Sequence, residues 1–261
     1  MLGAVIGDIV GSIYEFHNIK TKHFPLFKKN CFFTDDTVMT FAIYLAITDK
    51  KGNLEDNAIY YMQTLGQLYP HRGYGGMFAS WLYSDDPKPY DSFGNGAAMR
   101  VSPCGFLAKT LDQAKELAYR VTKVTHDNPE GLKGAEATTV AIWLAKNHYS
   151  KDKIRKYIND NYYDLNFTLK QIRPTYYFNE TCQETVPQAI VAFLESNSFE
   201  DAIRNAISIG GDSDTLAAIT GSIAEAYYGI PKKIKRKAMY FLDDYFKELS
   251  REYYRKMQEG I

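Results

Sequence analysis

Residues 208–224 read SIGGDSDTLAAITGSIA, and this stretch decides the fold because it joins a glycine turn to a helix apolar enough to be buried. Asp212 and Asp214 stand between the turn and the apolar run. Charged side chains are almost never buried without a partner, so this pair of carboxylates needs a counter-charge. A metal ion would supply it.

Helix capping is the alternative explanation of these acids. Asp and Ser side chains accept the free amide hydrogens of a first helical turn, and one such residue is enough. A second stretch argues against capping alone: residues 32–37, FFTDDT, again place a hydroxyl, paired Asp and Thr ahead of an apolar helix. Two such stretches, far apart in the sequence, indicate two helix starts that converge on one site.

Composition and charge exclude several classes of protein. The 261 residues carry 31 basic and 31 acidic side chains, so the electrostatic footprint of a general nucleic-acid binder is missing. Three widely spaced cysteines fit a reducing compartment rather than a disulfide framework. The apolar N-terminus has no basic region, and no apolar run is long enough to span a bilayer. We therefore expect a cytoplasmic protein without a membrane partner.

The periodicity of apolar residues predicts helices along most of the chain. Apolar residues recur at steps of three and four, and no stretch shows sustained period-two alternation. Two more helices are expected between residues 184 and 209, the second opening at Ser198, and Asn128 and Pro129 are expected to start another. The remaining helical patterns cover residues 36–48, 54–68, 75–83, 111–124 and 231–257. Residues 149–182 give no clear prediction.

The N-terminal segment, residues 2–15, carries a repeated glycine. Gly3, Gly7 and Gly11 lie four apart, so they share one face if the segment is helical. Glycine costs about 1 kcal/mol per helical position relative to alanine, so three on one face predict another helix packed very close. Glu15 ends the segment, where an acid is unfavourable to the helix dipole. That makes Glu15 a candidate ligand or base.

Residues 92–96, SFGNG, precede a small-residue helical start. Such a loop exposes backbone amides that suit an anion such as a phosphate, although a plain turn explains the same residues. His126 also has two explanations, because a buried histidine either contacts a ligand or forms a hydrogen bond within the core.

The groups left unexplained are all oxygen donors. Such hard ligands select Mg²⁺, Mn²⁺ or Ca²⁺ over zinc or copper. Because one Mg²⁺ usually takes only one or two carboxylates, the charge of the set favours a dinuclear centre. The set is Glu15, Thr34, Asp35, Asp36, Asp212, Asp214 and Thr215.

Five motifs together resemble the ADP-ribosylglycohydrolase family, and they occur in the family's order. They are Gly7-Asp8-x-x-Gly11-x-x-x-Glu15, Thr34-Asp35-Asp36-Thr37, the run from Ser92 to Arg100, Thr125-His126, and the run from Gly210 to Thr215. The resemblance implies a single compact all-α domain over residues 1–261, with a binuclear Mg²⁺ or Mn²⁺ site at the base of a cleft. It also implies hydrolysis of the N- or O-glycosidic bond between ADP-ribose and a modified acceptor.

The resemblance assigns roles to residues of this sequence. The implied metal ligands are Thr34, Asp35, Asp36, Asp212, Asp214 and Thr215, with Asp214 as the bridge and Glu15 as a further ligand. Glu15 and Asp36 are the implied catalytic residues, Glu15 positioning or deprotonating the water. The implied substrate-binding residues are Ser92, Phe93, Gly94, Asn95, Gly96 and His126, where the loop holds the diphosphate through its amides and Phe93 stacks on adenine.

The expected partner is an ADP-ribosylated protein or a small ADP-ribose conjugate, and the chain is expected to be a monomer. One alternative is a catalytically inactive family member that binds ADP-ribose or serves structurally. Another is an HD-type phosphohydrolase built on His126 and Asp127, which lacks further histidines at recognisable positions. The acceptor stays open among arginine, serine, a nucleobase and O-acetyl-ADP-ribose. It is expected to depend on the loops 17–31, 70–76 and 160–182.

Overall fold

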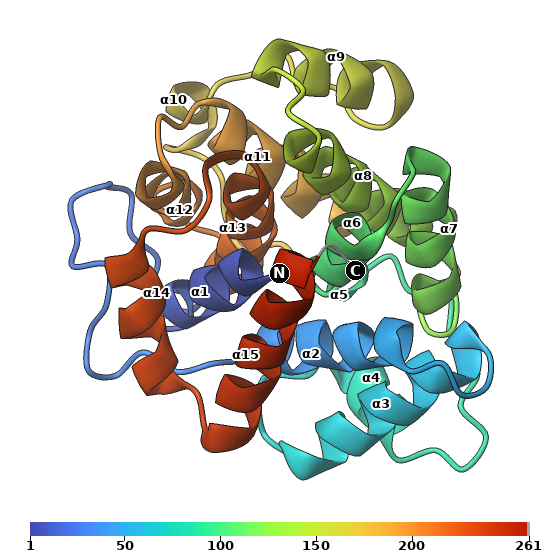
Figure 1. Cartoon of the computed structure of the whole chain (residues 1–261). Coiled ribbons are helices and arrows are strands. Elements are labelled where there is room, and N and C mark those ends of the chain that lie inside the picture. Colours follow the sequence, from blue (N-terminus) through green and yellow to red (C-terminus); the bar gives the residue numbers. More distant parts are fainter. Residues whose placement is uncertain (260–261) are drawn as a thin grey trace.

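Helices make up all the regular structure in the part of the chain that the computed structural model describes, residues 1–259, with side chains through residue 257 (Figure 1). The predicted all-α class is therefore confirmed. The elements are α1 Leu2–Gly11, α2 Asp35–Thr48, α3 Leu54–Leu68, α4 Gly76–Leu82, α5 Gly96–Met99, α6 Ser102–Leu107, α7 Leu111–Thr122, α8 Pro129–Lys146, α9 Lys151–Asn161, α10 Leu169–Ile172, α11 Cys182–Leu194, α12 Phe199–Ile207, α13 Ser213–Tyr228, α14 Lys232–Ala238, the 3-10 helix η1 Met239–Phe241, and α15 Asp244–Glu259.

The central feature is the contact between α1 and α13 (Figure 1). A Cβ added to Gly7 would lie 1.9 Å from the carbonyl oxygen of Ala217, and one added to Gly3 would lie 2.0 Å from that of Gly221. A Cβ on Gly11 would lie 2.4 Å from the Cα of Asp214. The expected close helix packing is confirmed, and the partner is the helix that follows the 208–215 stretch.

α13 is buried along most of its length because it also packs against α8, α11 and α12. Its residues from Ser213 to Ala224 are all buried, and apolar side chains of these helices join one continuous core. The stretch 208–224 therefore places two carboxylates where the chain enters the middle of the molecule.

Local capping starts several helices as the sequence predicts. Thr34 accepts from the amide of Asp36 at the start of α2, Asn128 accepts from that of Glu130 ahead of Pro129 in α8, and Ser198 caps α12. Asp212 occupies the N-cap position of α13 without a side-chain capping hydrogen bond. Thr34 therefore caps α2, whereas capping does not explain why Asp212 stands at the start of α13.

The prediction of one helix over residues 231–257 is wrong. The segment divides into α14, η1 and α15, and Leu242 between them is extended. The cause is Asp243, whose Oδ1 accepts from the amide of Phe246 at 2.9 Å and so begins a new helix. Its Oδ2 accepts from the hydroxyl of Tyr69 at 2.6 Å, which anchors the break. Residues 149–182, without a prediction, contain α9 and α10.

None of the helices in the described range is both long enough and apolar enough to cross a bilayer.

We expect Gly7→Ala to lower the free energy of unfolding by about 3 kcal/mol or more, because the new methyl group meets backbone rather than a movable side chain. Urea denaturation followed by circular dichroism measures the change. Gly76→Ala is the matched control, since a Cβ there meets nothing within 4 Å and its stability should stay equal or rise slightly. Equal stability of the two variants would contradict the close contact.

Candidate functional site

A cavity of about 420 Å³ lies where the starts of α2 and α13 face the Ser92–Gly96 loop. Its wall also includes Phe78, His126 and Glu180. Most of the residues that the sequence proposed line this one cavity, from segments far apart in the chain. They are Glu15, Asp35, Asp36, Ser92, Gly94, Asn95, Gly96, His126, Asp212, Asp214 and Thr215.

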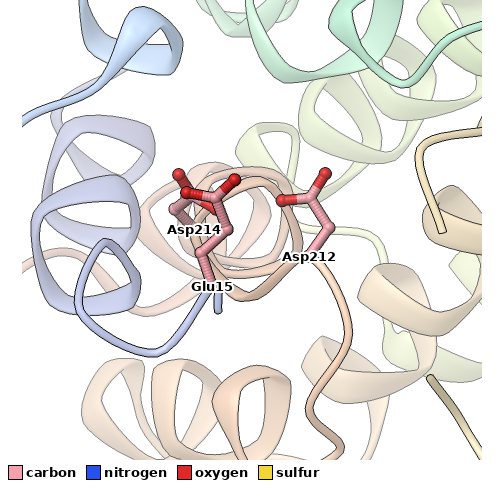
Figure 2. A group of neighbouring side chains, drawn as sticks. All are labelled: Glu15, Asp212 and Asp214. Atoms are coloured by element: carbon pink, nitrogen blue, oxygen red, sulfur yellow. The ribbon is translucent and has the colours of Figure 1, made fainter. Parts of the chain in front are cut away.

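The carboxylates of Glu15, Asp212 and Asp214 form the tightest group in the cavity. One oxygen of each lies within 4.8 Å of the others, and Figure 2 shows Glu15 beside the two aspartates at the start of α13. Glu15 reaches this position because α1 packs directly on α13 and the chain turns back just after Gly11. The proximity of these three acids is thus a consequence of the helix contact.

Among the described residues that line the cavity, two buried carboxylate oxygens have no hydrogen-bond partner: Oδ1 of Asp36 and Oδ1 of Asp214. The other oxygen of Asp36 accepts from the Thr215 hydroxyl at 3.2 Å. Oδ2 of Asp212 accepts from Nδ2 of Asn95 at 2.7 Å. Buried polar atoms are nearly always paired, so these orphaned oxygens mark where a ligand is missing from the protein's own contacts.

Five acids that line the cavity have a raised pKa because they are buried and repel one another: Glu15, Asp35, Asp36, Asp212 and Asp214. Burial lifts the pKa of Asp35, Asp36 and Asp212 well above the ordinary value. Burial followed by the charges of Asp212, Asp8 and Glu180 raises the pKa of Glu15 to about 7, and burial followed by the charge of Glu15 raises that of Asp214 to about 8. The folded chain therefore disfavours the ionised form of these carboxyl groups unless a bound cation balances their charge.

The donor set fits a divalent cation. Every candidate ligand is an oxygen, two of the buried oxygens are unpaired, and the described part of the chain places no ion-pair partner on any of the five acids. Hard cations such as Mg²⁺ and Mn²⁺ prefer such ligands. The geometry brings Glu15, Asp212 and Asp214 close enough together to hold one ion, and Asp35, Asp36 and Thr215 line the same cavity.

Thr34 lies behind this group rather than in the cavity wall. Its hydroxyl donates to Oδ1 of Asp8 at 2.8 Å, and its amide donates to Oδ2 at 2.9 Å. Thr37 donates to the same carboxylate through its amide at 3.1 Å and through its hydroxyl. The Thr34 hydroxyl donates its hydrogen to Asp8 and accepts from the Asp36 amide, so its oxygen keeps one lone pair that can serve a cation. Asp8, a motif residue without an assigned role, therefore anchors the start of α2.

The amides of the glycine loop are used differently from the expectation. The Gly94 amide donates to the Ser92 hydroxyl at 3.2 Å, and the Asn95 amide donates to the Glu180 carbonyl at 2.7 Å. These two amides already have partners within the chain, and the expectation that the backbone of the 92–96 loop holds a diphosphate stays a prediction. The side chain of Ser92 and the backbone of the loop still line the cavity.

Phe93 lies outside the cavity wall, whereas His126 is part of it. Phe93 is 46% exposed and lies outside the cavity wall, so the structure does not bring its ring to the carboxylates. His126 is buried in the wall, with Nδ1 2.7 Å from the Thr125 hydroxyl and 3.4 Å from Nη2 of Arg100. Burial, followed by the Arg100 charge, lowers the pKa of His126 well below its ordinary value. A neutral imidazole thus faces the glycine loop.

Several lining residues were missed from the sequence. Arg100 is fully buried and is the one cationic side chain in the wall among the residues described. The sequence feature that could have indicated Arg100 as a lining residue is its position at the end of the motif 92–100. Tyr90, Phe178 and Glu180 carried no signal, because their segments lack periodicity. Of the loops expected to surround the cleft, 70–76 and 160–182 contribute to the wall, whereas 17–31 does not.

Comparison with known proteins gives consistent results. The sequence profile of the ADP-ribosylglycohydrolase family matches residues 1–260. ADP-ribosylhydrolase ARH3 of Homo sapiens is 24% identical over 306 aligned residues, covering 88% of this chain and 84% of that protein. ADP-ribosylarginine hydrolase Tri1 of Pseudomonas putida (strain GB-1) is 27% identical, covering 88% of this chain and 70% of that protein. A solved structure titled ADP-ribosylglycohydrolase-related protein complex shares the fold, with a TM-score of 0.72, 21% identity, and coverage of 95% of this chain and 92% of that one.

We expect Asp214→Asn to stabilise the protein in EDTA, and to do so more at pH 8 than at pH 5. The raised pKa of Asp214 means that the folded state holds a proton that the unfolded chain releases above about pH 4, so wild type loses stability as pH rises towards 8. The variant lacks this loss, and the difference should reach the order of a few kcal/mol. Urea denaturation at each pH measures it.

The lowered pKa of His126 has the opposite effect, because it stabilises the folded state as pH rises. This effect is present in both proteins, so it cancels when the free energy of unfolding of wild type is subtracted from that of Asp214→Asn. Asp112→Asn is the control, because Asp112 is an exposed acid in the first turn of α7. A constant difference between Asp214→Asn and wild type across pH would contradict the strained carboxylate group.

Proposed function

The chain belongs to the ADP-ribosylglycohydrolase family, and on that premise we propose that it is an ADP-ribosyl hydrolase whose activity depends on a divalent cation. Its substrate is ADP-ribose joined to a modified acceptor, either a mono-ADP-ribosylated protein or a smaller ADP-ribose conjugate. The observation that carries the proposal is the group of five acids in one cavity, two of whose buried oxygens have no partner among the described residues.

The proposed cofactor is a pair of Mg²⁺ or Mn²⁺ ions. The ligands would be the Asp, Glu and Thr side chains at the cavity floor, with Asp214 as the residue shared between the ions and Thr34 contributing from behind. When bound, the ions supply Lewis acidity and a template for hydroxyl groups of the substrate. Their charge also offsets the repulsion that raises the pKa of each carboxylate.

Glu15 and Asp36 are the proposed catalytic residues. Cleavage at an anomeric carbon passes through an oxocarbenium-like transition state, and carboxylates near that carbon stabilise its positive charge. Glu15 is half-buried in the cavity wall, so it can reach both solvent and substrate. A carboxylate at this position can accept a proton from the attacking water. Asp36 lies deeper and keeps one oxygen unpaired.

The substrate-binding residues are proposed on the opposite wall. Ser92, Gly94, Asn95, Gly96 and His126 line the cavity where the ADP-ribose would lie. The loop backbone lies beside the imidazole, since a Cβ on Gly94 or Gly96 would stand 3.7 or 3.5 Å from Nε2 of His126, which is an ordinary contact distance. Arg100 adds a positive charge that suits a diphosphate. Stacking of Phe93 on adenine has no support from its placement outside the wall.

The cytoplasm is the proposed location, since all three cysteines are buried and unpaired in a manner that fits a reducing compartment. A single domain over residues 1–261 and a monomeric state stay predictions.

We expect the purified protein to release ADP-ribose from mono-ADP-ribosylated protein when Mg²⁺ or Mn²⁺ is present and to lose that activity in EDTA. Chromatographic quantification of free ADP-ribose measures the release, and readdition of metal should restore it. Isothermal titration with ADP-ribose runs alongside. Binding without turnover on arginine-, serine- and nucleic-acid-linked substrates would favour the non-catalytic alternative and overturn the hydrolase proposal.

We expect Asp214→Asn to lower activity by at least about a hundredfold, because it removes a charged ligand from the floor of the cavity. Mn²⁺ titration calorimetry should show weaker binding in the same variant. Asp112→Asn again serves as the control and should match wild type in both measurements. If Asp214→Asn kept both its metal affinity and its activity, the assignment of Asp214 as a ligand would be wrong.

A further inference from the structure

The mouth of the cavity beside Glu15 carries an aromatic pair and a carboxylate that the proposed reaction does not use. Phe178 and Glu180 both line the cavity. The Phe178 ring stacks on that of Phe16, with centroids 5.8 Å apart and planes inclined by 26°. Because Phe16 directly follows Glu15, the aromatic pair stands next to the proposed catalytic acid.

The segment that carries Glu180 is held against the glycine loop. The Glu180 carbonyl accepts from the amide of Asn95 at 2.7 Å, and the amide of Cys182 donates to the Phe93 carbonyl at 3.0 Å. Gly94 and Thr181 form an antiparallel bridge between the two segments. Glu180 therefore has a backbone fixed relative to the cavity, even though its side chain is exposed.

Glu180 is a negative charge without a partner. None of the ion pairs or side-chain hydrogen bonds within the described residues involves its carboxylate. It lies at the exposed mouth, whereas the proposed metal ligands Asp36, Asp212 and Asp214 are buried at the floor. Its charge nevertheless reaches Glu15, since it is one of the charges that raise the pKa of that residue.

We propose that Glu180 and Phe178 form an acceptor subsite for a planar cation, so that the enzyme prefers ADP-ribose carried by a guanidinium group over ADP-ribose carried by a neutral hydroxyl. This inference rests on the proposed hydrolase function and names the class of acceptor. A guanidinium donates a pair of hydrogen bonds to a carboxylate and also stacks on an aromatic ring, so both members of the subsite contribute. A serine acceptor offers Glu180 no charge to pair with.

The test compares one peptide sequence that carries ADP-ribose on either arginine or serine. We expect a higher kcat/KM on the arginine-linked peptide for the wild-type protein. Glu180→Gln should lower kcat/KM on that peptide about fivefold, mainly through KM, because an exposed ion pair is lost while the cavity floor is unchanged. The same variant should keep its activity on the serine-linked peptide and its affinity for free ADP-ribose within about twofold.

Glu184→Gln is the matched control, because Glu184 is an exposed acid four residues along the chain and lies outside the cavity wall. It should leave both substrates unaffected. Equal loss on both peptides in Glu180→Gln, or no loss on either, overturns the subsite and leaves the hydrolase intact. Absence of hydrolysis of either peptide by wild type overturns the hydrolase proposal itself.

Discussion

The close packing of α1 on α13 is the constraint on which the rest of the site depends. Glycines at three positions let one helix backbone lie directly on the other, so the segments that follow α1 and precede α13 emerge side by side. Asn18 then joins these segments, since its side chain donates to the carbonyls of Tyr14 and Gly211 and accepts from the Gly211 amide. The repulsion among Glu15, Asp212 and Asp214 is therefore opposed by core packing rather than by local ion pairs. A stable core is a condition for keeping such an acidic group together.

Two kinds of buried carboxylate occur near the site, and their hydrogen bonds distinguish their roles. Asp8 receives hydrogen bonds from both the amide and the hydroxyl of Thr34 and Thr37, so its charge is shared by four donors. Asp36 and Asp214 each keep an oxygen without a donor among the described residues. The first arrangement is that of a structural anchor, and the second suits the metal ligands that we propose. Motif membership alone does not distinguish them.

The sequence predicted those features that depend on local rules. The spacing of Gly3, Gly7 and Gly11 predicted the helix contact, and Asn128 and Ser198 predicted the starts of α8 and α12. Features set by contacts between distant segments escaped prediction. The Asn95 amide, which could bind an anion, donates to the Glu180 carbonyl instead. Asp243 interrupts the C-terminal helix and accepts a hydrogen bond from Tyr69. The Phe93 side chain is largely exposed. None of these follows from periodicity or from the identity of the residue alone.

Asn95 connects regions of the cavity that have been described separately. Its backbone amide holds the carbonyl of Glu180 at the mouth, while its side chain holds Asp212 at the floor and the Thr185 hydroxyl at the start of α11. Asn95 therefore links the Glu180 segment at the mouth to Asp212 at the floor. Displacing either region would break a hydrogen bond to Asn95 or move the other region. These hydrogen bonds order this part of the cavity wall within the folded chain. The entropy of arranging this wall is lost during folding and not on encounter with a ligand, and such pre-organisation strengthens binding.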